Sequence, residues 1–549
     1  MIESLEPRIA PATVSVAAAL RTATWTDFDG DKVTLKWTTG DAPVFTTVDA
    51  GPADGLIVKR IIFGTSNTGA RVTIAVKAAG GGDGRIDLGR VDATGVGLAS
   101  WSSPRATIAE IDAGDGTVSF RTFTSAGLGV QPFGLFPNSS GDGVSRIDGK
   151  VGTFTVRGDI GATKLQFAAP LGTKIAKIDI KGDLLGSAPN SPANIGSSGV
   201  IEIDGADEVT SIVIGGSIIG GRTANTGLLQ CFTSIASLTI KGGIIGGDAT
   251  NTGVASLGSV KTITVGGNLQ GGTADSTGTL TGGDVTSSLT LGGSVIGGAV
   301  PGTAVIAFIK AGKVLIKGSI IGTAEIANGA NKPSAALLLS GAVGSVTLGG
   351  DLLGGSNGAG ASISYNGALL FGENVGSVTV KGSIRGTDGL SAVILAKGAT
   401  PVQPGNFNAI GKLAIGGSVS LATIAAGHEY DLTTLAARIG SAENPDAGIG
   451  SVTVGGDWRH SNLIAGISDA NSNGVDATDT RATGDATRQA GIGAIVIKGD
   501  LLNNGALAGT SGFAAEKIAS ITAGGQKVFS TAGPDKPLSW DGRVSVRQI

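Results

Sequence analysis

Oxygen-bearing side chains alternate in one segment of the C-terminal third of the chain. They are Asp469, Asn471, Asn473, Asp476 and Asp479. The first three precede Gly474 in the spacing of the first half of an EF-hand-like loop, and Ca²⁺ takes about six to eight oxygen ligands of this kind. Thr480 stands where such a loop carries its glutamate, and no helices are expected on either side. The segment predicts a calcium site, with a solvated loop as the alternative.

A second alternation of carboxylates lies near the N-terminus, where Asp27, Asp29 and Asp31 surround Gly30. Carboxylates that alternate in a tight turn can ligate Ca²⁺. Asp-Gly is also the composition of a hairpin turn. The segment therefore predicts either a second calcium site or a polar turn that holds no metal.

Both histidines of the chain lie in one region that also carries aromatic and cationic side chains. The residues are His428, Tyr430, Trp458, Arg459 and His460. Enzymes that cleave polysaccharides use clustered carboxylates, and a patch of this composition predicts a glycan site or, in an enzyme, a polysaccharide lyase or hydrolase. Neither stretch carries a lyase or hydrolase motif, so packing of an inserted loop is the alternative. We assign no catalytic residue and do not expect an enzyme.

The elements that position these residues form a repeat that ends in glycine. The segments 235–246, 260–271 and 343–354 share one pattern. Gly242 and Gly267 are 25 residues apart, whereas Gly456 and Gly499 are 43 residues apart. A constant short unit with a variable excess indicates one repeated rung that carries insertions at its corners.

Each repeat contains three short strands. In the main strand, Leu238 and Ile240 alternate with polar residues, which is the period of a strand. A Gly-Gly pair follows, which would permit a positive φ or a sharp bend. A short apolar strand comes next, such as Ile244–Ile245, and then a third strand, such as residues 253–257. This pattern predicts an all-β, right-handed parallel β-helix, a solenoid of roughly sixteen rungs.

The chain divides into three regions by composition. Residues 1–82 are rich in aromatics and predict a β-rich N-terminal cap, with longer strands at 32–37 and 59–63. Residues 83–525 predict the β-helix, whose corner insertions enlarge after residue 350. Residues 526–549 form a C-terminal tail, and its last strand either caps the helix or pairs with a neighbouring molecule. The open strand edges of a β-helix also favour end-to-end association.

Serine and threonine recur at the outward positions of the main strand. Examples are Thr153 and Thr155, Ser237 and Thr239, Thr262 and Thr264, Ser288 and Thr290, Ser345 and Thr347, Ser377 and Thr379, and Ser451 and Thr453. The array is interrupted at Asp179, Val213, Leu315, Ala414 and Val496. A regular, uncharged face favours lateral association between copies. It also resembles the faces of ice-binding solenoids, which makes ice binding a lesser alternative.

Composition excludes several other classes of protein. The chain has 549 residues, of which 95 are glycine, and a formal net charge of −3. Without a basic surplus, no nucleic-acid partner is expected. No apolar run approaches the ~20 residues of a transmembrane helix, and the N-terminus lacks the features of a secretory signal. The single cysteine, Cys231, is expected in the core, and Ca²⁺ is the only cofactor predicted.

The N-terminus resembles a known motif. Leu5–Glu6–Pro7–Arg8–Ile9–Ala10–Pro11–Ala12 is similar to the LEPR motif near the N-terminus of large exported proteins of planctomycete and verrucomicrobial bacteria. Residues 26–34 are similar to a segment that follows this motif, and the glycine-rich repeats extend the resemblance over most of the chain. The resemblance implies an extracellular or cell-surface location and no particular activity.

Together, these observations predict a structural extracellular or cell-surface β-helix protein that self-assembles into a filament, layer or adhesive fibre. A β-helix that binds or degrades polysaccharides, with cell-surface glycans as partners, is the first alternative. An ice-binding solenoid is the second.

Overall fold

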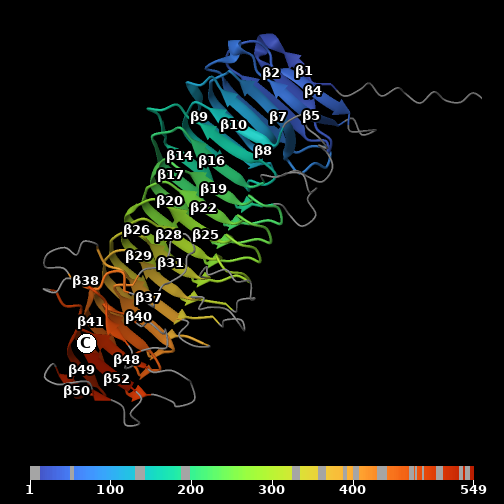
Figure 1. Cartoon of the computed structure of the whole chain (residues 1–549). Helices are drawn as coiled ribbons and strands as arrows, with labels where there is room; N and C mark the ends of the chain where they lie inside the picture. The colour runs from blue at the N-terminus through green and yellow to red at the C-terminus, as the bar shows by residue number, and fades with distance from the viewer. Residues whose placement is uncertain are drawn as a thin grey trace, which may run out of the picture. The chain divides into compact units, whose positions relative to one another are not determined.

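The structure is a computed structural model. It describes residues 13–49, 55–129, 142–186, 198–323, 334–355, 366–387, 392–399, 407–428, 442–468, 475, 479–484, 488–502, 511–530, 536–537 and 544–548. Successive strands of the repeat pair in parallel, one rung after the next, so the predicted parallel β-helix is confirmed (Figure 1). The described helical segments are single 3₁₀ turns, Ala18–Leu20 and Thr65–Asn67. No helix in the described part of the chain is long and apolar enough to span a membrane.

The chain forms two compact units. Unit 1 comprises residues 1–242 with 256–258, and unit 2 comprises residues 243–255 with 259–549. The boundary falls within the repeat, at a different place from the predicted end of the cap at residue 82. Each unit is described by itself.

One rung of unit 2 illustrates the three-strand repeat. It consists of β23 (Val260–Val265), β24 (Leu269–Gln270) and β25 (Thr279–Gly282), and each pairs in parallel with its counterpart in the next rung. Those counterparts are β26 (Val285–Leu291), β27 (Val295–Ile296) and β28 (Val305–Phe308). The main, second and third strands therefore lie where the sequence predicts them.

The main strands form one continuous parallel ladder in each unit. In unit 1 they are β9 (Val118–Leu128), β11 (Lys150–Val156), β14 (Lys177–Ile180), β17 (Glu208–Ile214) and β20 (Ser234–Ile240). In unit 2 they continue through β29 (Ala311–Ile316), β32 (Val343–Leu348), β35 (Val375–Val380), β38 (Asn408–Ile415), β41 (Gly448–Val454), β46 (Gly491–Ile497) and β49 (Lys517–Ala523). Their inward residues stack in register, as Val314, Val346 and Val378 do, and each of these three is at most 1% exposed. Stacked aliphatic side chains thus form the interior of these rungs of unit 2, whereas Phe123 and Phe154 stack between β9 and β11 of unit 1, with ring centroids 4.2 Å apart.

A hydrogen-bonded side-chain ladder follows the corner after the main strands, and the sequence did not reveal it. Asn268 Oδ1 accepts a hydrogen bond from the Ser294 N–H (2.8 Å), and Ser294 Oγ accepts one from the Ser319 N–H (3.0 Å). The same contact recurs at later rungs, through Ser319, Asp351, Ser383, Ser418 and Asp457. Each corner residue therefore satisfies a backbone donor of the next rung.

The corner ladder adds a reason for the glycine after each main strand. Gly293 and Gly382 lie in bends, as one of the two expectations had it, but neither adopts a positive φ. Instead, a Cβ on Gly293 would collide with Asn268 Oδ1, and a Cβ on Gly382 would collide with Asp351 Oδ1. Glycine is required here because the corner side chain of the preceding rung occupies the space of a Cβ.

Both described ends of the β-helix carry antiparallel strands. At the N-terminal end, β1 (Ser15–Ala17), β2 (Thr22–Thr26), β3 (Lys32–Trp37) and β6 (Arg71–Lys77) pair antiparallel in that order. β4 (Val44–Asp49) pairs antiparallel with β5 (Leu56–Ile62). Parallel pairing begins between β5 and β7 (Ile86–Thr94) and between β6 and β8 (Leu98–Gly114).

At the C-terminal end, β50 (Gln526–Ser530) turns back on β49, and β51 (Lys536–Pro537) pairs antiparallel with β52 (Val544–Gln548). β52 itself pairs in parallel with β48 (Ser511–Ala515) of the same chain. The last strand is therefore part of the chain's own cap in this structure.

The third strands of unit 2 carry two different outer faces. They are β25, β28, β31 (Ala336–Leu339), β34 (Ala368–Phe371), β37 (Ala392–Ala396), β40 (Ala422–Ala426), β43 (Asn462–Ala465) and β48. One register-matched column runs through them, which we call the outer column: Thr281, Ala307, Leu338, Leu370, Leu395, Ala425, Ile464 and Ala514. Its first two residues are partly exposed, and the other six are buried.

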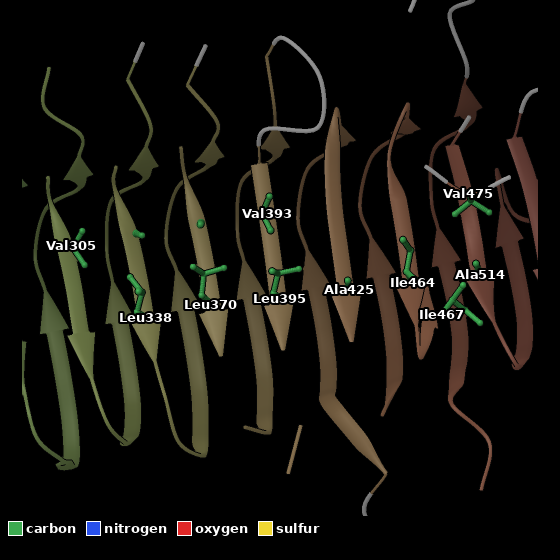
Figure 2. Close-up of a cluster of buried hydrophobic side chains, with 12 residues drawn as sticks. Val305, Leu338, Leu370, Val393, Leu395, Ala425, Ile464, Ile467, Val475 and Ala514 are labelled. Carbon is green, nitrogen blue, oxygen red and sulfur yellow. The ribbon is translucent and has the colours of Figure 1, made fainter. Parts of the chain in front are cut away.

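The buried part of the outer column belongs to a continuous apolar cluster (Figure 2). Ile467 and Val475 pack against this cluster and are themselves 0% exposed. Val475 belongs to the segment from Asp469 to Asp479, for which a solvated loop was the alternative to a calcium site. Val475 itself is not solvated, because it packs against an apolar strand face.

Candidate functional site

The carboxylates of Asp27, Asp29 and Asp31 meet in the turn between β2 and β3. The Asp27 N–H donates to the Asp31 carbonyl oxygen (3.0 Å), and the Gly30 N–H donates to the Asp27 carbonyl oxygen (3.2 Å). Gly30 adopts a φ of 99°, which favours glycine. One carboxylate oxygen of each aspartate lies within 4.8 Å of the others. The segment thus forms the hairpin turn that was predicted, and this turn brings the three carboxylates together.

A glycine-rich loop that follows β6 holds this turn. Asp31 Oδ1 accepts a hydrogen bond from the Ala79 N–H (3.0 Å), and Asp31 Oδ2 accepts one from the Gly84 N–H (2.5 Å). A Cβ on Gly82 would collide with the Asp31 carboxylate. The loop therefore closes over the cluster so tightly that residue 82 must lack a side chain.

Two oxygens of the cluster are buried without a hydrogen-bond partner among the described residues. They are Oδ2 of Asp27, a residue that is 4% exposed, and Oδ1 of Asp29. Burial, and then the neighbouring Asp29 carboxyl, raise the pKa of Asp27 to about 7, whereas the contact with Asp27 lowers the pKa of Asp29. Two ionised carboxylates can only accept hydrogen bonds, so this pair requires either a shared proton or a cation between them.

Two further aspartates adjoin the cluster, and the sequence did not single them out. The Asp83 N–H donates to Asp29 Oδ2 (3.3 Å). Burial raises the pKa of Asp87, and the charges of Asp83 and Asp29 raise it further. The only sequence signal for this loop is its run of glycines ahead of β7, because nothing local relates residue 83 to a turn more than fifty residues earlier.

The other predicted calcium segment lies mostly outside the described residues, which include neither Asp469, Asn471, Asn473 nor Asp476. Its last member, Asp479, is 1% exposed. Asp479 precedes β45 (Thr480–Arg481), which pairs antiparallel with β44 (Ile467–Ser468). The described strands that flank the segment in sequence thus pair with each other, and calcium binding by the segment stays a prediction.

Two members of the predicted glycan patch are buried. His428 and Trp458 are 0% exposed, and the Trp458 indole N–H donates to the Ser461 carbonyl oxygen (3.0 Å). Its ring lies 5.2 Å from that of Phe513, centroid to centroid. Arg459 is exposed and forms an ion pair with Asp457 (2.6 Å). A buried tryptophan cannot stack on a sugar, so this prediction is wrong for His428 and Trp458.

His460 lies near the surface, and Tyr430 lies outside the described residues. Trp458 packs in the core as part of the second strand β42 (Trp458–Arg459), and not in an inserted loop as the alternative interpretation had it.

The outward serines and threonines of unit 2 lie in two register-matched columns, which we call the hydroxyl face. One column comprises Thr262, Ser288, Lys313, Ser345, Ser377 and Lys412; the other comprises Thr264, Thr290, Leu315, Thr347, Thr379, Ala414 and Thr453. All of these residues are partly or fully exposed. Lys313 and Lys412 are interruptions beyond those expected. In unit 1, the corresponding face carries a charged group in which Lys177 and Lys181 each pair with Asp179 (2.8 Å).

No protein-family model, curated protein or solved structure matches the chain. The function must therefore be argued from the described residues.

Proposed function

We propose that the chain is a structural β-helix protein of the cell surface or extracellular space, and that copies associate side by side through the hydroxyl face of unit 2. The observation that carries this proposal is the register of that face. Its two columns repeat at the spacing of stacked strands, ~4.8 Å. A face that is periodic in this way is complementary to a second copy of itself displaced by whole rungs.

The composition of the hydroxyl face supports its association with the hydroxyl face of a second copy. Between β32 and β35 it presents Ser345, Thr347, Ser377 and Thr379, which are short, uncharged and partly exposed. Short side chains lose little conformational entropy at an interface, and their hydroxyls both donate and accept hydrogen bonds. This stretch of the face, which lies between Lys313 and Lys412, can meet a copy of itself without charge repulsion.

The ends of the helix support lateral over end-to-end association. The described N-terminal edge strand β1 is three residues long, and very short edge strands limit pairing with other chains. The described C-terminal end is closed by the antiparallel strands β50 and β51. Both features reduce the backbone edge that another copy could extend.

The location outside the cell is supported by the N-terminal resemblance at residues 5–12, which lie outside the described residues. Antibody labelling of intact and permeabilised source cells tests this part. Labelling confined to permeabilised cells would contradict it.

Paired substitutions on the hydroxyl face test the association. We expect purified protein to form filaments or sheets in negative-stain microscopy, and the double variant Thr347→Glu/Thr379→Glu to remain monomeric in light scattering. Repulsion between stacked carboxylates on facing copies is the physical reason. Thr281→Glu, a partly exposed position on another strand face, is the control and should assemble like the unmodified protein. A protein that stays monomeric at all concentrations, or a double variant that assembles normally, would contradict the proposal.

The interruptions at Lys313, Leu315 and Lys412 disfavour ice binding, which requires a continuous flat array. Thermal hysteresis in a concentrated solution of the monomeric double variant and of the unmodified protein separates this alternative from self-association.

A further inference from the structure

We propose that the turn between β2 and β3 and the loop that follows β6 bind one calcium ion through Asp27, Asp29 and Asp31. This inference is independent of self-association, because the site lies in the N-terminal cap and involves no residue of the hydroxyl face.

The first support is the pair of oxygens that lack a partner. Asp31 is fully buried, and the backbone of the glycine-rich loop satisfies its two oxygens. Asp27 Oδ1 accepts a hydrogen bond from the Asp31 N–H (2.8 Å). Asp27 Oδ2 and Asp29 Oδ1 have no donor among the described residues, so only a proton shared by the two carboxyls or a bound cation can join them. Because a buried unpaired carboxylate oxygen is costly, a ligand between these two oxygens would stabilise the cap.

The second support is the local balance of charge. Asp83 and Asp87 add two carboxylates beside the three of the cluster. The neighbouring guanidinium of Arg105 borders Gly84 and donates to the Val76 carbonyl oxygen (3.4 Å). No ion pair to Asp27, Asp29 or Asp31 occurs among the described residues. A cation from solution would supply the missing positive charge.

The donor set favours calcium over magnesium. The oxygens belong to carboxylates on one turn, covered by a loop, and the remaining ligands would be water. Ca²⁺ accepts such irregular sets, whereas Mg²⁺ demands a near-ideal octahedron and releases its water reluctantly. Bound calcium would join the turn at residues 27–31 more firmly to the loop at residues 79–84.

Isothermal titration of the full chain, stripped with a chelator, with CaCl₂ and separately with MgCl₂ tests the site. We expect a calcium-binding event with a Kd on the order of 10⁻⁵ to 10⁻³ M, and weaker or no binding of magnesium. Asp29→Asn should weaken this event at least about tenfold, because it removes a ligand charge at a partly exposed position that tolerates an amide.

Two controls make the result specific to this turn. Asp115→Asn changes an exposed turn aspartate of the same unit whose Oδ1 accepts from the Thr117 and Val118 N–H groups (2.8 Å each), so it should bind like the unmodified chain. Asp469→Asn changes the other predicted calcium segment. This variant should retain the calcium-binding event that Asp29→Asn weakens. Loss of that event in Asp469→Asn but not in Asp29→Asn would overturn the proposal, as would the absence of calcium binding to the unmodified chain.

Thermal unfolding of Asp27→Asn provides a second readout. An amide at residue 27 can donate to Asp29 Oδ1, so the variant should unfold no earlier than the unmodified chain in chelator and should lose the calcium-dependent rise in Tm. A variant that keeps the full rise would overturn the proposal. If Asp27→Asn fails to fold, the same measurement is made on Asp29→Asn, which should also lose the calcium-dependent rise in Tm.

Discussion

The outer column of unit 2 changes character between its early and late rungs. At β25 and β28 it presents Thr281 and Ala307 to solvent in part, whereas at β34 and β37 it presents Leu370 and Leu395, both 0% exposed. The backbone pairing is the same in both regions. The difference teaches that one strand ladder can serve as the wall of a single core in some rungs and as the partition between two cores in others.

Within unit 2, the change coincides with the first lengthened step between anchor glycines. The anchors Gly293 and Gly318 are 25 residues apart, whereas Gly318 and Gly350 are 32 apart. Leu338, the first buried member of the outer column, lies within that longer step. Along the outer column of unit 2, the lengthened steps and the buried residues thus begin together, and the described residues Ile467 and Val475 show that inserted chain contacts this face.

The largest loss of stability is expected when a charged residue is introduced into the buried, late part of the outer column. Leu370→Asp should destabilise unit 2 by more than about 4 kcal/mol, because it buries an unpaired carboxylate and removes apolar packing. Thr281→Asp, in the same column at an early rung, should change stability by no more than about 0.5 kcal/mol. Chemical denaturation followed by circular dichroism measures both. Equal effects at the two positions would show that the two regions do not differ.

A smaller loss of stability is expected at the corner ladder, which both regions share. It should be the same in the early and the late rungs. Ser294→Ala and Ser383→Ala each remove the acceptor of one backbone N–H, at 3.0 and 3.2 Å, and each should cost about 1 kcal/mol. The same denaturation experiment compares them. A much larger cost at Ser383 would mean that the insertions act on the corner as well as on the outer column.

The smallest change is expected in the reactivity of a cysteine on the inner face of the third strands, which should not react with an alkylating reagent in the native protein. In β19 (Leu228–Cys231) of unit 1, Cys231 is 0% exposed, and burial raises the pKa of its thiol. The thiolate is the reactive form, so iodoacetamide should not modify Cys231 until the protein unfolds. Mass spectrometry of native and denatured samples measures this. A cysteine introduced as Thr281→Cys should react in the native state, and rapid native modification of Cys231 would show that the interior opens.

Local alternation predicted much of the fold. The three strands of each rung, the longer strands at the N-terminal end and the outward position of residues such as Thr347 follow from the period of a strand and from repetition. The late third strands also carried a signal that alternation alone overlooks. Residues 336–339, Ala-Leu-Leu-Leu, are apolar at consecutive positions, which is typical of strands buried on both faces.

Contacts between distant residues could not be predicted in this way. The Asp27–Asp31 cluster was identified from spacing, but the loop that encloses it depends on the pairing of β3 with β6. Trp458 was placed on a glycan surface because composition does not distinguish a stacking platform from a packed ring. The need for glycine at Gly293 arises from a side chain one rung earlier, which no local rule for glycine describes.

The corner ladder also bears on how such a chain changes length over evolution. Asn, Ser and Asp all serve at this position, and each offers an oxygen to the same backbone group of whichever rung comes next. Any rung that carries such a residue can therefore follow any other and form the same corner hydrogen bond. Duplication or loss of a whole rung leaves matched neighbours on both sides, so the gene can lengthen or shorten in whole rungs while the fold is preserved.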